Sequence, residues 1–95
     1  MIIANVTFET ELTEEEVLQV ANERLPLFRE IPGLLQKYYV KRSQPNTYSG
    51  VYIWDSIESL QTFRASELAA TIPLAYKVIG QPKVEVDQIF IQLRD

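Results

Sequence analysis

The apolar residues near the N-terminus alternate in a pattern that predicts a β-strand over residues 2–10. Its even-numbered apolar positions share one face, and they are Ile2, Ala4, Val6 and Phe8. The odd-numbered face, which includes Ile3, Asn5 and Thr7, is only weakly polar. A strand with two such faces is typical of a central position in a sheet that is covered on both sides.

A helix is predicted to begin directly after this strand. Thr13 is an N-cap candidate, and Glu16 stands three residues later to complete a capping box. Apolar residues then recur at helical spacing, at Val17, Ala21, Leu25 and Phe28. Pro26 is expected to kink or break this helix because proline lacks an N–H group, and Pro32-Gly33 is expected to end it.

The middle of the chain predicts a β-hairpin. Leu34 to Arg42 forms the first strand and Tyr48 to Trp54 the second, with a turn cluster at residues 43–47 between them. Gln36, Tyr38 and Val40 fall on one side of the first strand, opposite Leu35, Lys37 and Tyr39. The basic residues of this strand are interpreted as a solvated face, and they are Lys37, Lys41 and Arg42.

The last third of the chain predicts more helix and a final strand. Asp55 or Ser56 caps a second helix. Residues 68–79 read as a shorter helical piece that Pro73 interrupts and Gly80 stops. Val84 to Leu93 reads as the last strand, with a bulge expected near Asp87-Gln88 because the apolar phase changes there.

The predicted order is therefore β-α-β-β-α-β, the ferredoxin-like α+β fold with an antiparallel sheet. Both helices cover one face of such a sheet, and the other face needs a cover. A second copy of the chain is the simplest one, so we expect a homodimer through the sheet faces. A charge at an inner sheet position, for example Val6→Asp, is expected to disrupt that dimer.

Composition narrows the chemistry. The 95 residues, of which 46% are hydrophobic, suit a single domain over residues 1–95. The chain has no cysteine and no histidine, so acid–base chemistry falls to carboxylates, lysine, tyrosine or the substrate. The net charge of −4 argues against nucleic acid as a partner. No signal peptide or membrane span is recognised, so a cytoplasmic location and no membrane partner are expected.

Three features together resemble a known family. They are a proline-containing first helix, the Pro32-Gly33 pair and the strand Gly50 to Trp54 before a capped helix, and they lie in the stretch ERLPLFREIPGLLQKYYVKRSQPNTYSGVYIWDSIESLQTF. The chain resembles the YdhR-type monooxygenases, which are close in architecture to the antibiotic biosynthesis monooxygenase superfamily of dimeric α/β barrels. The resemblance spans nearly all of the chain.

The resemblance implies a homodimer with facing sheets and a small apolar pocket between sheet and helices in each subunit. It also implies oxidation of a small aromatic or quinol-like substrate by molecular oxygen, with no cofactor and no metal. Haem-degrading relatives use an Asn, a Trp and a His. Asn5 matches the first of these, whereas Phe63 and Tyr76 stand near the other two positions, so haem degradation is not expected.

Seven residues are candidates for the site. Asn5 is a possible hydrogen-bond donor to a phenol or oxyanion, and Tyr76 a phenolic acid or lid residue. The candidates for substrate binding are Tyr38, Tyr52, Trp54, Phe63 and Arg64. Each has a structural alternative: a satisfied amide for Asn5, core or cross-strand packing for the aromatic residues, and a surface position for Arg64.

Two functional alternatives stay open from the sequence. One is a non-catalytic small-molecule-binding or stress-related homodimer. The other is an isomerase or lyase that acts on a small lactone or aldehyde, which would need a Tyr, Asp or Glu with a shifted pKa in the pocket. The acidic run Glu14-Glu15-Glu16 is interpreted as helix capping, so no metal site is expected there.

Overall fold

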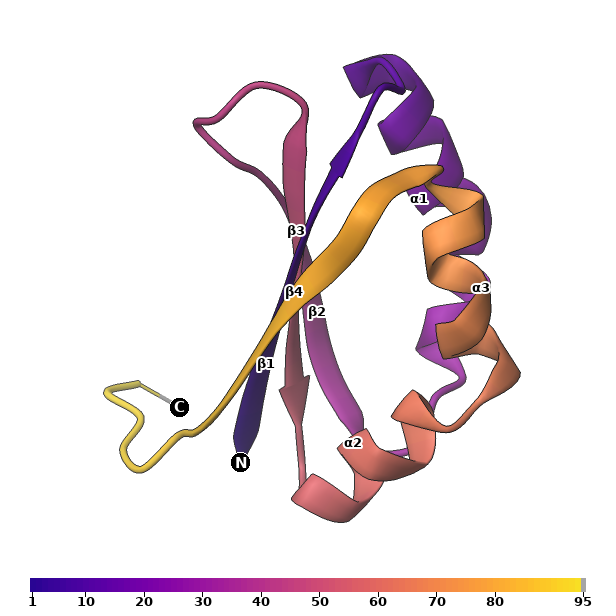
Figure 1. The fold of residues 1–95 in the computed structure, drawn as a ribbon. Coiled ribbons are helices and arrows are strands. Elements are labelled where there is room, and N and C mark those ends of the chain that lie inside the picture. The colour runs from indigo at the N-terminus through magenta and orange to yellow at the C-terminus, as the bar shows by residue number, and fades with distance from the viewer. Residues whose placement is uncertain (95) are drawn as a thin grey trace.

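The computed structural model describes residues 1–94. Its elements are β1 (Ile2–Thr10), α1 (Glu14–Arg29), β2 (Leu34–Lys41), β3 (Thr47–Trp54), α2 (Ile57–Arg64), α3 (Glu67–Ala75) and β4 (Val78–Gln88) (Figure 1). Within residues 1–94, no helix combines the length and apolarity that crossing a bilayer requires.

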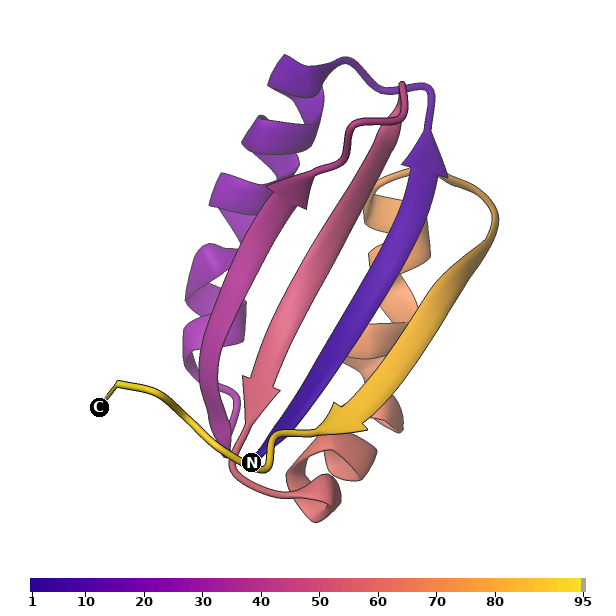
Figure 2. The same ribbon diagram turned by 90° about the vertical axis from the view of Figure 1, so that its left-hand side faces the viewer.

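The four strands form one antiparallel sheet in the order β2-β3-β1-β4. The helices cover one face of this sheet and leave the other face open, so the molecule has two layers (Figures 1 and 2). The predicted ferredoxin-like fold is confirmed. The helical region before β4 is divided into α2 and α3, because Ser66 accepts a hydrogen bond from the Ala69 N–H and caps a new helix.

The start of α1 matches the prediction, but its course does not. Thr13 and Glu16 form the predicted capping box. The helix then continues through Pro26 to Arg29, so the expected break is wrong. Proline removes only the bond to the carbonyl of Asn22, and both residues are exposed, so water can satisfy that carbonyl.

The end of α3 also differs from the prediction. Pro73 lies within the helix, which runs to Ala75. Lys77, rather than Gly80, ends the helical stretch, because its φ of 49° turns the chain into the left-handed region. The buried Thr10 hydroxyl fixes this turn by donating to the Tyr76 carbonyl at 2.6 Å.

Strand β4 begins at Val78 and ends at Gln88, earlier at both ends than expected. Its irregularity lies opposite the step from Thr7 to Glu9, where Ile79 and Lys83 are the flanking partners, and not at Asp87-Gln88. Residues 89–94 continue as an irregular tail that leaves on the open side of the sheet (Figure 1). Phe90 in this tail is 92% exposed.

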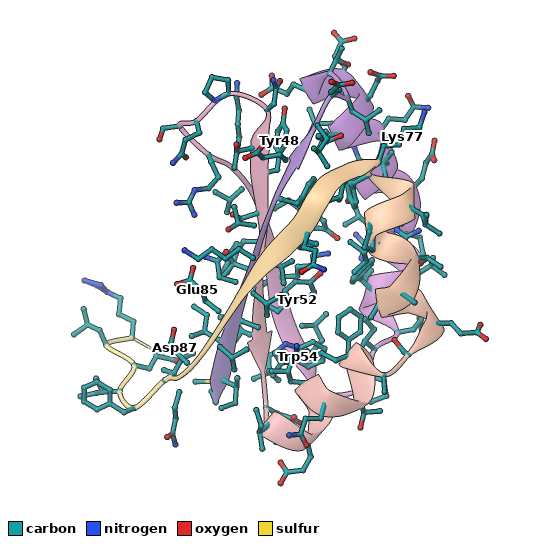
Figure 3. All side chains as sticks on the ribbon, viewed as in Figure 1. Tyr48, Tyr52, Trp54, Lys77, Glu85 and Asp87 are labelled. Carbon is teal, nitrogen blue, oxygen red and sulfur yellow. The ribbon has the colours of Figure 1, made fainter. Side chains whose placement is uncertain are left out.

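The core lies between the sheet and the helices. The register pairs Ala4 with Tyr52 and Phe8 with Tyr48, so the even-numbered residues of β1 and β3 face the helices. The fully buried Trp54 packs there against Tyr52 and Phe63. Figure 3 places Tyr52 and Trp54 on the helix side of the sheet, and Glu85 and Asp87 on the open side.

Candidate functional site

A cavity of about 120 Å³ lies between the sheet and helices α1 and α3. Cavities of about 150 Å³ accommodate a benzene ring, so this one suits a small, single-ring molecule. Its walls are mostly apolar, and its polar side chains come from the strands, from Glu14 at the start of α1 and from the α3 terminus. These polar side chains include Lys37, Tyr39, Lys41, Tyr48, Tyr52 and Tyr76.

Lys37 reaches into this cavity from β2 and ends among aromatic rings. Its Nζ atom lies 3.6 Å from the ring centroid of Phe28, 4.3 Å from that of Tyr39 and 4.5 Å from that of Tyr52. These rings come from α1, β2 and β3. Three different elements therefore surround one amine, which we call the Lys37 cage.

Gly50 on β3 makes room for this cage. A Cβ atom at Gly50 would lie 3.1 Å from Tyr52 Cε1 and 3.3 Å from Lys37 Cε, which is tight packing for both neighbours. The absence of a side chain at this position lets the Lys37 methylenes and the Tyr52 ring lie side by side over the strand.

The surroundings of Lys37 favour its neutral form. Burial, together with the positive charge of Arg24, lowers the pKa of Lys37 to about 7. The ring faces attract the ammonium form and act in the opposite direction. Among residues 1–94, the ion pair that the structure contains joins Lys41 to Glu14, so no carboxylate there compensates Lys37. At neutral pH a substantial share of this amine is free to accept a proton.

The tyrosine hydroxyls of the cavity keep their protons. Burial raises the pKa of Tyr76 to about 12 and raises that of Tyr52 further, and Tyr39 adds to both effects. Burial also raises the pKa of Tyr39. The cavity therefore combines a base with proton-holding hydroxyls, a division that is typical of acid–base sites.

The structure brings two of the predicted site residues together. Tyr52 and Tyr76 both line the cavity. Asn5 does not, because it lies on the open face of β1, where the Thr7 hydroxyl donates to its Oδ1 atom at 3.3 Å. Tyr38 lies on the same open face and is 55% exposed. The expectation that Asn5 and Tyr38 line a pocket beneath the helices is wrong, because strand alternation turns both side chains away.

The remaining three predicted residues lie outside the cavity. Trp54 is 0% exposed and its indole Nε1 atom has no hydrogen-bond partner within residues 1–94, so it is a core residue that a ligand cannot reach here. Phe63 is buried beside it and borders a separate hollow near Pro32. Arg64 is exposed at the end of α2. The structure thus favours the packing and surface alternatives for these residues.

Sequence reasoning missed Lys37, which it assigned to a solvated face. The signal was present in part, because alternation already placed Lys37 and Tyr39 on the side of β2 opposite Tyr38. What the sequence did not give was the position of Phe28, which α1 carries over the strand to close the cage. A basic residue on the helix-facing side of an edge strand is therefore the feature of the sequence that indicates Lys37.

Comparisons with known proteins place the fold. No protein-family model and no curated protein sequence matches the chain. Among solved structures it is similar to SnoaB, a cofactor-independent oxygenase from Streptomyces nogalater, with 14% identity, a TM-score of 0.76, and coverage of 99% of this chain and 97% of the other. It is similar to the ActVA-Orf6 monooxygenase of Streptomyces coelicolor, solved with nanaomycin D, with 20% identity, a TM-score of 0.77, and coverage of 99% and 91%.

A third similar structure is a candidate antibiotic biosynthesis monooxygenase from Deinococcus radiodurans. It has 18% identity, a TM-score of 0.74, and coverage of 100% of this chain and 98% of the other. At these identities the likeness concerns the fold. The chain has the ferredoxin-like fold of the antibiotic biosynthesis monooxygenases.

Proposed function

We propose that the protein is a cofactor-independent monooxygenase that acts on a small phenol or quinol in the cavity between the sheet and α1. The observation that carries the proposal is the Lys37 cage, an amine that lies against the Tyr52 ring, at a cavity that Lys37, Tyr52 and Tyr76 line together. The fold shared with SnoaB, a cofactor-independent oxygenase, supports the reaction class.

The chemistry begins with the removal of a proton. The neutral Lys37 amine takes the proton of the substrate hydroxyl, and the electron-rich phenolate gives an electron to molecular oxygen. The resulting phenoxyl radical and superoxide combine at the ring carbon para to the hydroxyl, which forms a C–O bond. The peroxide formed in this way takes the proton back from Lys37. Loss of water then leaves a quinone, so that one phenol and one O₂ yield one quinone and one H₂O.

The tyrosine hydroxyls fit the role of donors in this reaction. Tyr52 and Tyr76 hold their protons at neutral pH, so they can donate hydrogen bonds to the developing oxyanion. No hydrogen bond within residues 1–94 already engages either hydroxyl. The mostly apolar walls lower the local dielectric constant, which strengthens such bonds.

We also infer a homodimer through the open sheet faces. Ile3, Val51 and Ile53 lie on that face as partly buried apolar residues, and Figure 1 shows no helix on that side of the sheet. The exposed apolar side chains of the tail leave on the same side, and they are Phe90, Ile91 and Leu93. This arrangement corrects the test position, because Val6 lines the cavity on the opposite face. The expected cytoplasmic location remains a prediction.

Oxygen uptake tests the enzyme proposal. The purified protein is mixed with a panel of monocyclic phenols and quinols in metal-free buffer, and uptake is compared between the wild type, Lys37→Gln and Lys77→Gln. We expect uptake to fall at least roughly tenfold in Lys37→Gln, since general-base catalysis contributes about 10²–10⁴-fold. Lys77 is exposed in the turn between α3 and β4, away from the open sheet face, and serves as the matched control.

Either of two results would count against the proposal. Uptake that is unchanged in Lys37→Gln would remove the lysine from the reaction. Ligands that raise the melting temperature but are recovered unchanged, with no uptake across the panel, would favour a binding protein instead.

A further inference from the structure

The amine of Lys37 differs from those of the other lysines in the chain. The sequence contains four lysines, and they are Lys37, Lys41, Lys77 and Lys83. Lys41, Lys77 and Lys83 are exposed. Lys37 alone is partly buried, with its amine in contact with three ring faces. A surface lysine would extend its amine into water, so this placement needs a specific account.

Burial and the charged groups around Lys37 disfavour the ammonium form of its amine. From α1, Arg24 lies with its guanidinium carbon 6.0 Å from the Phe28 centroid and donates to Thr71 Oγ1 at 2.9 Å. From β2 and β3, Tyr39 and Tyr52 present uncharged phenols. Arg29 borders a second hollow that Lys37 also lines. The neighbours of the amine are therefore positive or neutral.

The carboxylate that lines the same cavity does not neutralise this amine. Glu14 begins α1, roughly 20 Å along the helix from Phe28 at the helical rise of about 1.5 Å per residue. It is held by Lys41 Nζ at 2.8 Å. Within one cavity, the amine of Lys41 is therefore paired with a carboxylate, whereas the amine of Lys37 is not.

We propose that Lys37 is an amine nucleophile that condenses with a small aromatic aldehyde in the cavity to form an imine. Amines become nucleophilic in proteins when they are desolvated in an apolar pocket or placed beside another cation, and Lys37 meets both conditions. This activity needs no oxygen and goes beyond the proposed oxygenation.

The step balances with groups that the cavity supplies. The Nζ lone pair attacks the aldehyde carbon, and the carbonyl oxygen takes a proton to give a carbinolamine. Loss of that oxygen as water leaves a C=N bond, so that one aldehyde and one amine yield one imine and one water. Tyr52 and Tyr76 line the same cavity, and in this proposal their hydroxyls donate to the carbonyl oxygen.

The lining selects the aldehyde class. The walls are rings and aliphatic side chains, and the volume of about 120 Å³ leaves room for one ring. An aromatic aldehyde places its carbonyl at the edge of such a ring. Ring-on-ring contacts with Tyr39 or Tyr52, which both line the cavity, then hold it beside the amine.

Reductive trapping tests the proposal directly. The full chain is incubated under nitrogen with benzaldehyde and sodium cyanoborohydride at pH 7, and each lysine's benzyl adduct is quantified over time by peptide mass spectrometry. We expect Lys37 to be labelled at least roughly tenfold faster than Lys41, because its lower pKa leaves far more neutral amine at this pH. Lys41 is the internal comparison, since it lines the same cavity.

Further arms separate reactivity from other effects. Lys37→Arg is expected to lose the fast labelling while circular dichroism stays unchanged. The rate at Lys37 should level off above about pH 7, whereas the rate at Lys41, whose pKa is raised, should keep rising above that pH. Equal labelling rates at all four lysines would overturn the nucleophile. Fast labelling of Lys37 by formaldehyde but not by benzaldehyde would overturn the aromatic class. Because oxygen is excluded, these results do not depend on oxygenase activity.

Discussion

Lys37 and Lys41 lie on the same face of strand β2, but their amines have opposite environments. Lys41 Nζ is 2.8 Å from Glu14 Oε1 and is largely exposed, and its pKa is raised by that hydrogen bond and charge. Lys37 Nζ is 3.6 Å from the Phe28 ring centroid, and its pKa is lowered. The end of β2 near the turn to β3 thus stabilises the charged form of Lys41, whereas the middle of the strand destabilises the charged form of Lys37.

This contrast predicts a pH dependence of stability. The pKa of Lys37 is about 7 in the folded protein and about 10.4 in the unfolded chain. Between these values the unfolded chain binds more protons, so the free energy of unfolding rises with pH, with a slope that approaches about 1.4 kcal/mol per pH unit. Below the pKa of Lys37 in the folded protein, the loss of stability caused by its positive charge no longer changes with pH.

Urea unfolding of the wild type and Lys37→Met between pH 6 and pH 9.5 (roughly the window of the two pKa values) measures this slope. The difference in unfolding free energy between the two proteins should shrink as pH rises. The raised pKa values of Tyr52 and Tyr76 act above this window and are common to both proteins. Parallel curves across the window would contradict a depressed lysine pKa.

Gly50→Ala should close the Lys37 cage. The new Cβ atom would press on Tyr52 Cε1 and Lys37 Cε, so the ring and the amine must shift. We expect the free energy of unfolding to fall by roughly 1–3 kcal/mol, the usual cost of overpacking, and ligands of one ring to bind more weakly. Thermal-shift titration with phenol checks this, and an unchanged affinity would place the ligand elsewhere.

Gly33→Ala and Gly80→Ala form a matched pair. Both glycines have positive φ values, 82° and 68°, so alanine at either position costs about 1–2 kcal/mol from the left-handed conformation. Gly33 also packs against the Ser59 side chain and Asp55 Oδ1, whereas Gly80 has open space around it. Denaturant unfolding should give a clearly larger loss for Gly33→Ala, and equal losses would mean that the α2 cap yields to the added methyl.

Val51→Asp tests the inferred dimer. Val51 lies on the open face of the central strand β3, opposite Asn5, so a charge there should separate two facing sheets. Leu74→Asp is the control, because Leu74 is 79% exposed on the helix side. Analytical ultracentrifugation should give a dimer for the wild type and the control and a folded monomer for Val51→Asp. A dimer in all three would exclude this face as the interface.

The fold could be predicted further than the site. Alternation along β1 and β2 showed which residues share a face, although not which face meets the helices, and Thr13 and Glu16 marked the start of α1, because these are local rules. The helix breaks predicted at the prolines were wrong, because Pro26 and Pro73 each remove one hydrogen bond without ending a helix.

The site depended on contacts between distant elements. Asn5 attracted attention as a polar residue in an apolar strand, but its amide is used by Thr7 on the open face. Lys37 looked ordinary because nothing in its own strand shows that Phe28, from the preceding helix, lies over it. Tyr52 and Tyr76 were found as aromatic residues, and their joint position beside Lys37 followed only from the folded chain.

The irregular register of β4 has a consequence for aggregation. A sheet with an exposed edge strand can recruit the edge of another molecule, and proteins prevent this with prolines, bulges and charges at the edge. Strand β4 carries Pro82 at its irregular step, followed by Lys83, Glu85 and Asp87. Backbone pairing along this edge is therefore obstructed, so the protein is protected from growing into extended fibres even while its sheet face stays available to a partner.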